Sequence, residues 1–324
     1  MRAGKISETV LKRSVLKKLE KNREEVIQGP GLGVDAAVLK TKEECLLFSA
    51  ECISEKVEDA CFYGMNRALN NLACAGAKPV GILLNILMDP DISEEMLQKF
   101  MERASGLCSR YKIDILGGHT QVTDRVGGLL PSFTAVGFGK EKRQELTFKK
   151  EAGLILTKEI ALEGSCMLAW EKAGELEGYF NREFVRNAKN FKEKLSILPE
   201  AELLQNEENI LMHDLSQGGI LAGLWEMAER TAMGLEVDLK AVPIRQESVE
   251  ICEYFSLNPY ELLSGGALLI AAENAQELTG RLQKAGIRAS IIGRLTSGRD
   301  RILHSGEVVS YLNRPAMDNI YKLF

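Results

Sequence analysis

A glycine-rich loop that runs directly into an apolar strand constrains this chain more than any other feature. The stretch GPGLGVD at residues 29–35 precedes the apolar residues 36–39. Glycines lack a Cβ, so their backbone N–H groups can approach an anion closely, and Asp35 can hold a cation bound to a phosphate. The loop comes before its strand, which excludes both a Walker A loop and a Rossmann turn. Taken alone, the stretch also fits a plain turn.

The length and composition indicate a two-domain globular protein. A chain of 324 residues fits two domains of roughly 150 residues. We place them at residues 1–146 and 147–324, because the charged stretch 139–145 is typical of a connection between domains. With a net charge of −5 and no basic run, the chain is not expected to bind nucleic acid.

Cysteine usage and hydropathy predict the compartment. Seven cysteines occur without a Cys-x-x-Cys pair, which is typical of a reduced, cytoplasmic protein. The N-terminus has no signal sequence, and no apolar run approaches 18 residues. We therefore expect no contact with a membrane.

Periodicity in the first half predicts an α+β layer with two helices on one side of a sheet. Residues 7–21 have the spacing of a docking helix whose basic face is solvated. Two short strands, 36–39 and 45–49, are expected to be joined by the polar turn 41–44. The remaining elements are a helix over about 59–73, a strand over 79–88, a helix that begins after Ser93, a strand over 113–116 that ends at Gly117, and a strand over 130–137.

Four polar residues in this half are candidates for function. Glu51 lies at the end of a strand, where a solvated carboxylate is the alternative. Asn70 and Asn71 are adjacent within a helix, where asparagine is unfavourable, so we expect either hydrogen bonds to neighbouring backbone or contact with a ligand. His119 follows two glycines, and it either binds a metal or phosphate or has a structural role.

In the second half, Asp214 is the most informative residue. It precedes Gly218 and Gly219 and an apolar helix, so its carboxylate either caps that helix or holds a substrate group. Residues 163–165 open another helix, for which we favour a simple helix start over an N-terminus that faces an anion. Strands over 153–157, 235–239, 267–272 and 289–292 and helices over 247–255 and 275–285 complete an α/β layer.

Six motifs together resemble the AIR synthase (PurM-like) superfamily, and they occur in the order typical of that family. The similarity is greatest to the hydrogenase-maturation protein HypE and to AIR-synthase-related proteins. The motifs are GPGLGVDAAVL at 29–39, FSAECI at 48–53, LNNLACAGAKP at 69–79, GGHTQV at 117–122, HDLSQGGI at 213–220 and LSGGALLI at 263–270.

This resemblance implies a PurM-like two-domain fold of the α+β class. The N-terminal α/β domain would pair with its twin, so that two sheets form a β-barrel across a homodimer, and a C-terminal α/β domain would follow. ATP and a divalent metal, Mg²⁺, would bind between the domains. The implied reaction is phosphoryl transfer from ATP to an amide or carbonyl-type oxygen of a small metabolite, by positioning and charge stabilisation.

The resemblance also assigns roles by position. Metal ligands fall on Asp35, Glu51 and Asn71. Catalytic residues near the acceptor fall on His119 and Asp214. Nucleotide contacts fall on Gly31, Gly33, Asp35, Asn70, Gly117, Gly118 and Thr120.

Several positions depart from the family pattern. Val34, Asn71 and His119 stand where relatives commonly have acidic residues. Because Mg²⁺ prefers carboxylates and phosphates to imidazole, we expect one ion, with Asn71 as a neutral oxygen ligand. HypE carries its substrate group on a C-terminal cysteine, whereas this sequence ends in YKLF, so we do not expect that reaction here. The alternatives are a homodimeric nucleotide- or metabolite-binding protein without turnover and a partner in a maturation complex.

Overall fold

The computed structural model describes residues 4–5, 10–28, 38–39, 45–139, 148, 151–315 and 317–323. The chain divides into two compact units, residues 1–142 and 143–324, and each is described by itself. The predicted glycine loop, with Gly31, Gly33 and Asp35, lies outside the described residues. None of the helices in the described ranges has both the length and the apolar character needed to cross a bilayer.

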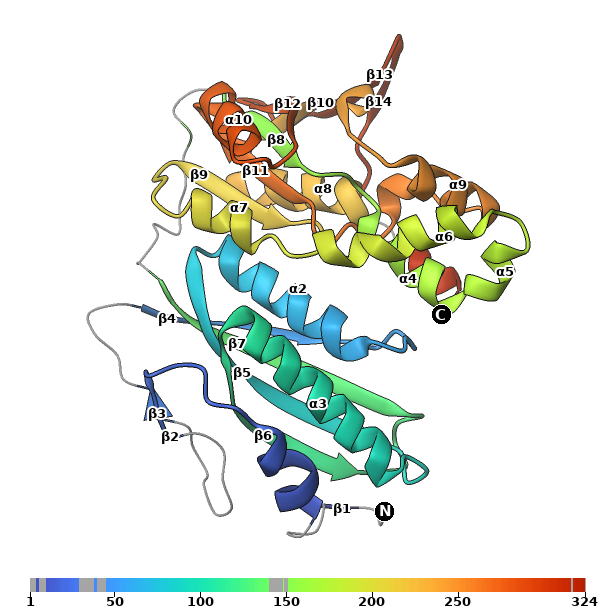
Figure 1. Ribbon diagram of the computed structural model, residues 1–324. Helices are drawn as coiled ribbons and strands as arrows, with labels where there is room; N and C mark the ends of the chain where they lie inside the picture. Colours follow the sequence, from blue (N-terminus) through green and yellow to red (C-terminus); the bar gives the residue numbers. More distant parts are fainter. Residues whose placement is uncertain are drawn as a thin grey trace. The chain divides into compact units, whose positions relative to one another are not determined.

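The first unit is built on a five-stranded sheet in the order β1-β6-β5-β7-β4, with α2 and α3 on one face (Figure 1). The two-stranded sheet β2-β3 lies beside it. Its strands are β1 (Gly4–Lys5), β2 (Val26–Gln28), β3 (Val38–Leu39), β4 (Cys45–Cys52), β5 (Ala77–Met88), β6 (Asp114–Val122) and β7 (Leu129–Gly139), and its helices are η1 (Leu11–Val15), η2 (Leu16–Lys18), α2 (Ala60–Cys74) and α3 (Glu94–Tyr111).

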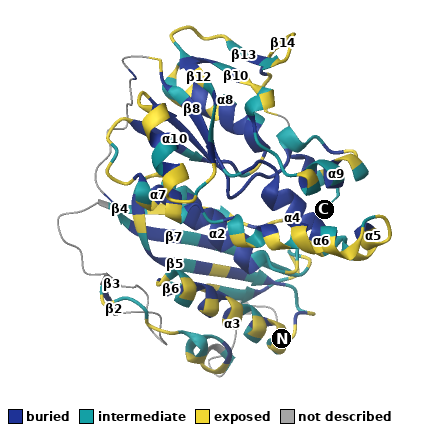
Figure 2. Ribbon diagram, turned by 45° about the horizontal axis from the view of Figure 1, so that its top comes forward, coloured by how far each residue is buried: buried dark blue, intermediate teal, exposed yellow. Residues whose placement is uncertain are grey.

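Side-chain caps start both long helices where the sequence predicts them. The Asp59 carboxylate accepts from the Phe62 N–H at the start of α2, and the Ser93 hydroxyl accepts from the Met96 N–H at the start of α3. At Gly64, α2 comes so close to the sheet that an added Cβ would lie 2.4 Å from the Phe133 ring. The core of the unit therefore lies between the helices and the strands β5 and β7, which are largely buried (Figure 2).

The strands predicted over 36–39 and 45–49 pair with different neighbours, β3 with β2 and β4 with β7. One prediction about strands in this unit is wrong, because the strand predicted over 113–116 does not end at Gly117. β6 continues to Val122 and pairs with β5 throughout. The glycines and His119 therefore lie within a strand, where alternation along the backbone decides the direction of each side chain.

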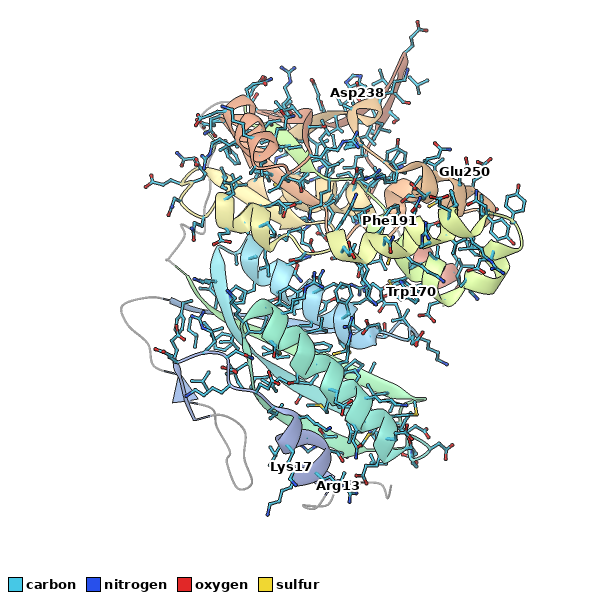
Figure 3. The ribbon with its side chains drawn as sticks, in the orientation of Figure 1. Arg13, Lys17, Trp170, Phe191, Asp238 and Glu250 are labelled. Carbon is cyan, nitrogen blue, oxygen red and sulfur yellow. The ribbon has the colours of Figure 1, made fainter. Side chains whose placement is uncertain are left out.

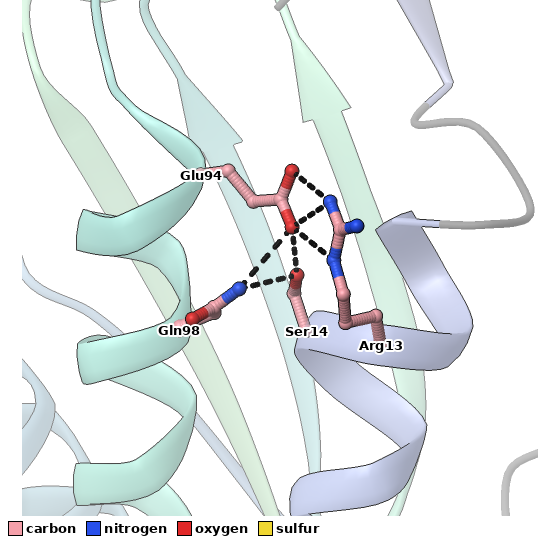
Figure 4. Close-up of polar contacts among 4 residues, drawn as sticks. All are labelled: Arg13, Ser14, Glu94 and Gln98. Atoms are coloured by element: carbon pink, nitrogen blue, oxygen red, sulfur yellow. Dashed lines mark hydrogen bonds and ion pairs between the residues drawn. The ribbon is translucent and has the colours of Figure 1, made fainter.

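The N-terminal segment is a shorter helix than the sequence predicts, and its basic face is not simply solvated. Figure 3 shows Arg13 and Lys17 on this segment, beside α3. Arg13 donates two hydrogen bonds to Glu94 on α3, with N–O distances of 2.7 and 2.6 Å, and Ser14 donates to the same carboxylate at 2.9 Å (Figure 4). One turn further on, Lys18 pairs with Glu102 at 2.5 Å. These charge-assisted contacts hold the segment along α3.

The second unit contains a seven-stranded sheet in the order β14-β13-β10-β12-β8-β11-β9. It has a well-packed core, and the predicted strands at residues 153, 235, 267 and 289 are all present. The strands are β8 (Gly153–Thr157), β9 (Ile210–Asp214), β10 (Gly234–Asp238), β11 (Leu268–Ala272), β12 (Ala289–Thr296), β13 (Arg301–Ser305) and β14 (Val308–Tyr311).

The helices of this unit alternate with its strands. Residues 182–194 form two consecutive short helices, α6 and η3. The helices are α4 (Leu162–Glu171), α5 (Ala173–Glu177), α6 (Arg182–Lys189), η3 (Asn190–Lys194), α7 (Leu198–Leu203), α8 (Gly219–Thr231), η4 (Leu239–Ala241), α9 (Gln246–Tyr254), η5 (Pro259–Glu261), α10 (Ala275–Lys284) and η6 (Asn319–Lys322).

Candidate functional site

Glu51 lies on the face of the five-stranded sheet that the helices cover. It stands opposite Phe133 on β7, and the Phe133 ring lies against Gly64 of α2. Directly opposed residues on neighbouring strands share a face. The Glu51 carboxylate accordingly points toward α2, where it meets Arg67.

His119 lies on the other face of the same sheet. It stands opposite the exposed Asn85, and its ring lies 3.3 Å from the side-chain oxygen of Gln121. Val122, three residues on, is buried opposite Met88 on the helix side. Because side chains alternate along a strand, His119 points away from the helices. The structure therefore does not bring His119 and Glu51 of one chain together, although the sequence suggests a shared site.

Thr120 alternates back to the helix side, opposite the buried Ile86. β6 and β4 are separated by β5 and β7, so Thr120 and Glu51 stand about 14 Å apart across the sheet. One metal ion cannot bind both side chains.

A buried arginine organises the end of β4. Arg67 on α2 is completely buried, and its Nη1 atom lies 3.1 Å from Oε1 of the equally buried Glu55 and 3.9 Å from Oε1 of Glu51. Two carboxylates thus lie beside one guanidinium. Glu51 remains one-fifth exposed. Arg67 and Glu55 are not among the site residues that the sequence predicts, although an arginine four residues before Asn71 in an apolar helix is a signal of a buried charge.

The adjacent asparagines on α2 differ in exposure. Asn70 is fully buried, whereas Asn71 is partly exposed and lies one helical turn beyond Arg67. Only Asn71 of this pair therefore presents its side chain toward an external ligand. Glu51 and Asn71 share the helix side of the sheet, which is compatible with their predicted role as metal ligands.

Close packing of β6 against β5 requires a glycine at position 118, whether or not a phosphate binds there. An added Cβ on Gly118 would lie 1.8 Å from the Leu84 carbonyl oxygen on β5. Gly118 also has a φ of 148°, which side chains rarely adopt. Gly117 is less crowded, since its added Cβ would meet only the Leu83 side chain, at 3.7 Å.

Asp214 is a buried carboxylate at the end of β9, opposite Leu268 of β11. The cap residue of α8 is Gly218, which has no side chain with which to cap the helix. The Gly218 N–H donates to the Asp318 carboxylate at 2.6 Å, and the same side chain caps η6. Asp318 lies one hundred residues after Gly218 in the sequence, and no local pattern indicated that the two would be in contact.

The two glycine motifs of the second unit meet in the structure. The Ser264 N–H donates to the Ser216 carbonyl, and Gly265 packs against the buried Glu163 side chain. Glu163 occupies the first turn of α4, and the Gly164 N–H donates to the Leu263 carbonyl. The N-terminus of this helix is therefore buried within the unit and lined by a carboxylate.

Among the residues that the structure describes, no group of three or more His, Cys, Asp or Glu side chains is placed to hold one metal ion. The buried thiols are poor nucleophiles. Burial raises the pKa of Cys108 and of Cys252 to about 12. Cys52 is exposed, but partial desolvation, followed by the Glu51 and Glu55 charges, raises the pKa of its thiol as well. These cysteines stay protonated near neutral pH.

Both units of the chain match a known protein family. Residues 33–138 match the N-terminal domain, and residues 149–305 the C-terminal domain, of AIR synthase related protein. A putative hydrogenase expression/formation protein of Methanocaldococcus jannaschii is 26% identical over 312 residues, which cover 90% of this chain and 88% of that protein.

A second relative is longer than this chain. The PurL subunit of phosphoribosylformylglycinamidine synthase from Beijerinckia indica is 26% identical over 310 residues, which cover 90% of this chain and 41% of PurL. Among solved structures, HypE in complex with ATP matches with a TM-score of 0.78 at 15% identity, covering 96% of this chain and 95% of HypE. With both of its domain types present in order, this chain belongs to the AIR synthase related family.

Proposed function

We propose that this chain is an ATP-dependent enzyme that transfers a phosphoryl group to an amide or carbonyl-type oxygen of a small metabolite. The observation that carries the proposal is the match of both units to a fold whose solved member HypE binds ATP. In the reaction, the bond between the terminal phosphorus and its bridging oxygen breaks, the acceptor oxygen takes the phosphoryl group, and ADP leaves. The protein contributes positioning and charge stabilisation. The compartment that we propose is the cytoplasm.

The donor set on the helix side of the sheet fits one Mg²⁺ ion. Glu51 offers a carboxylate and Asn71 an amide oxygen, and Asp35 is the further ligand assigned from the sequence. Mg²⁺ is usually held by one or two carboxylates together with substrate phosphates. Bound there, the ion would neutralise charge on the triphosphate. His119 of the same chain does not belong to this set, because it lies on the opposite face. A role for His119 and Asp214 at the acceptor stays a prediction.

We further propose that the chain is a homodimer paired through the face of the sheet that α2 and α3 leave uncovered. We call this surface the open face. Several of its apolar side chains are incompletely buried, and Phe48 is 61% exposed. Pairing of two open faces would bury these side chains, which supports the predicted barrel across a dimer. The apolar residues of the open face include Leu46, Phe48, Leu83, Leu87, Leu130 and Phe138.

Thermal unfolding with ATP or ADP, each with Mg²⁺, Mn²⁺ or no metal, tests nucleotide binding. A ligand at about one hundred times its dissociation constant adds roughly 2.7 kcal/mol, which raises Tm by a few degrees. We expect a metal-dependent shift that Glu51→Gln reduces. Glu95→Gln, which removes an exposed charge paired with Lys99 on α3, is the matched control. Absence of any nucleotide-dependent shift would refute the proposal.

A binding protein without turnover is the second candidate, and the Arg67 contact favours it. A guanidinium 3.9 Å from Glu51 offsets the charge that a metal would need there. ADP formation separates the two candidates. An enzyme releases ADP when its acceptor is supplied, whereas a binding protein shows the nucleotide-dependent Tm shift with every acceptor and releases none.

A further inference from the structure

The outermost strand of the second unit, β14, has an uncovered edge. It forms a hairpin with β13 across the turn at Gly306 and Glu307, and this hairpin projects from one end of the seven-stranded sheet (Figure 1). Within the part of the chain that the structure describes, no strand pairs with the outer side of β14. All of its side chains are exposed, including Val309 at 59% and Tyr311 at 67%.

The hydrogen-bond pattern fixes which backbone groups point outward. The Leu312 N–H donates to the Arg301 carbonyl at 2.8 Å, so these opposed residues form a hydrogen-bonded pair. In an antiparallel ladder such pairs alternate with non-hydrogen-bonded ones. Ser310 and Val308 therefore direct their amides toward β13. Val309 and Tyr311 direct theirs to the open edge.

Natural edge strands are usually protected by lysine, proline or a bulge. β14 contains none of these, and its sequence is Val-Val-Ser-Tyr. An edge of this kind accepts a further strand.

We propose that β14 pairs with β14 of a second copy of this chain, antiparallel and two-fold symmetric about Ser310. In this register Val309 of each copy stands opposite Tyr311 of the other copy. The outward N–H groups of Val309 and Tyr311 in both copies then donate hydrogen bonds across the pairing. A β-branched residue opposite an aromatic one is a favourable cross-strand pair. Glu307 falls opposite Asn313, so no like charges oppose each other at the ends. The edge is its own complement, which favours a second copy over an unrelated peptide.

The pairing is distinct from a dimer through the open face, because it involves the other unit. Four residues from each copy bury little surface, so we expect weak, concentration-dependent association. Covalent trapping in the full-length protein is the suitable measurement.

The register predicts which position cross-links. Ser310 of one copy stands opposite Ser310 of the other copy, and the two form a non-hydrogen-bonded pair. The Cα atoms of such a pair are about 4.5 Å apart, which suits a disulfide. Ser310→Cys should form an intermolecular disulfide under mild oxidation, read as a dimer on a non-reducing gel. Val308→Cys is the matched control, because the two copies of residue 308 stand about 14 Å apart along the strands. The unsubstituted protein controls for its own cysteines.

Charge substitutions in the Ser310→Cys background test the side-chain pairs. Val309→Lys with Tyr311→Lys opposes two lysines and should reduce the cross-linked fraction at least tenfold. Val309→Lys with Tyr311→Glu opposes lysine and glutamate and should keep it. The proposal is overturned if Ser310→Cys does not cross-link at high protein concentration, if Val308→Cys cross-links equally, or if the two charge variants behave alike.

Discussion

At the scale of single residues, Arg67 is the group on which the end of β4 depends. Its guanidinium is buried between Glu55 and Glu51, and no solvent reaches it. A buried charge pair is a weak net source of stability, but removing one partner leaves the other charge uncompensated. The same cluster sets the charge beside the proposed metal ligand.

We therefore expect Arg67→Met to lower the free energy of unfolding by about 3–5 kcal/mol, measured by urea denaturation. The control is Arg103→Met, which breaks a partly exposed pair between α3 and Asp59, the cap of α2, and should cost about 1 kcal/mol or less. Combining Glu55→Gln with Arg67→Met should recover part of the loss. Equal effects of the two arginine substitutions would contradict this account.

The glycines of β6 provide a second residue-scale test. Gly118→Ala should destabilise the protein far more than Gly117→Ala, because only the first Cβ collides with the Leu84 carbonyl. A loss of more than about 3 kcal/mol is expected for Gly118→Ala. Gly117→Ala should still cost some stability, because Gly117 has a φ of 155°, which side chains rarely adopt. The urea midpoints are compared without nucleotide, and equal losses for the two variants would contradict the collision with Leu84.

At the scale of elements, the N-terminal segment is held along α3 by polar contacts. The Asp114 carboxylate accepts from the Asn22 and Arg23 N–H groups at its far end, and Glu94 anchors its beginning. Contacts of this kind respond to salt and pH, whereas apolar packing does not. The segment should therefore detach before the rest of the unit unfolds.

The pKa of Glu94 is lowered by its hydrogen bond to Arg13 and then by that from Ser14. Because the pKa of Glu94 is lower in the folded protein than in the unfolded chain, where it is near 4.5, ionised Glu94 stabilises the folded state at pH values above 4.5. This contribution to the free energy of unfolding is lost as the pH falls through the folded-state pKa. Arg13→Ala should raise the Glu94 pKa toward 4.5 and reduce hydrogen-exchange protection in the segment. Both are measurable by NMR.

Lys99→Ala serves as the control for this experiment. It removes the partner that lowers the pKa of Glu95, the next residue of α3, but Glu95 does not contact the segment through Arg13 or Ser14. Protection of the segment should stay unchanged. A loss of protection with both variants would mean that α3 itself, rather than the polar contacts, governs the segment.

At the scale of the whole molecule, the proposed dimer depends on which side of the sheet the helices occupy. Phe48 on the open face and Met96 on α3 are both large, exposed apolar residues of the first unit. Phe48→Glu should convert the dimer to a monomer in sedimentation velocity, while Met96→Glu should not. The reverse result, or a wild-type monomer, would rule out pairing through the open face.

Local patterns were sufficient for most elements. The apolar spacing and caps of α2 and α3, and the apolar run of β5, each lie within one segment, and the structure confirms them. The motifs likewise identified the family, because six short segments in a fixed order carry that information without any knowledge of contacts. What these patterns could not supply was the partner of each strand, such as the pairing of β3 with β2.

The sequence by itself thus determined the family, most helices and most strands of this protein. Only the tertiary structure decided that His119 and Glu51 lie on opposite faces, that Arg67 is buried between two carboxylates, and that Asp318 holds Gly218. The physical reason is that propensity and periodicity act over neighbouring residues, whereas the face of a side chain depends on strand register and on where helices pack. Both of these are fixed by contacts between segments far apart in the chain.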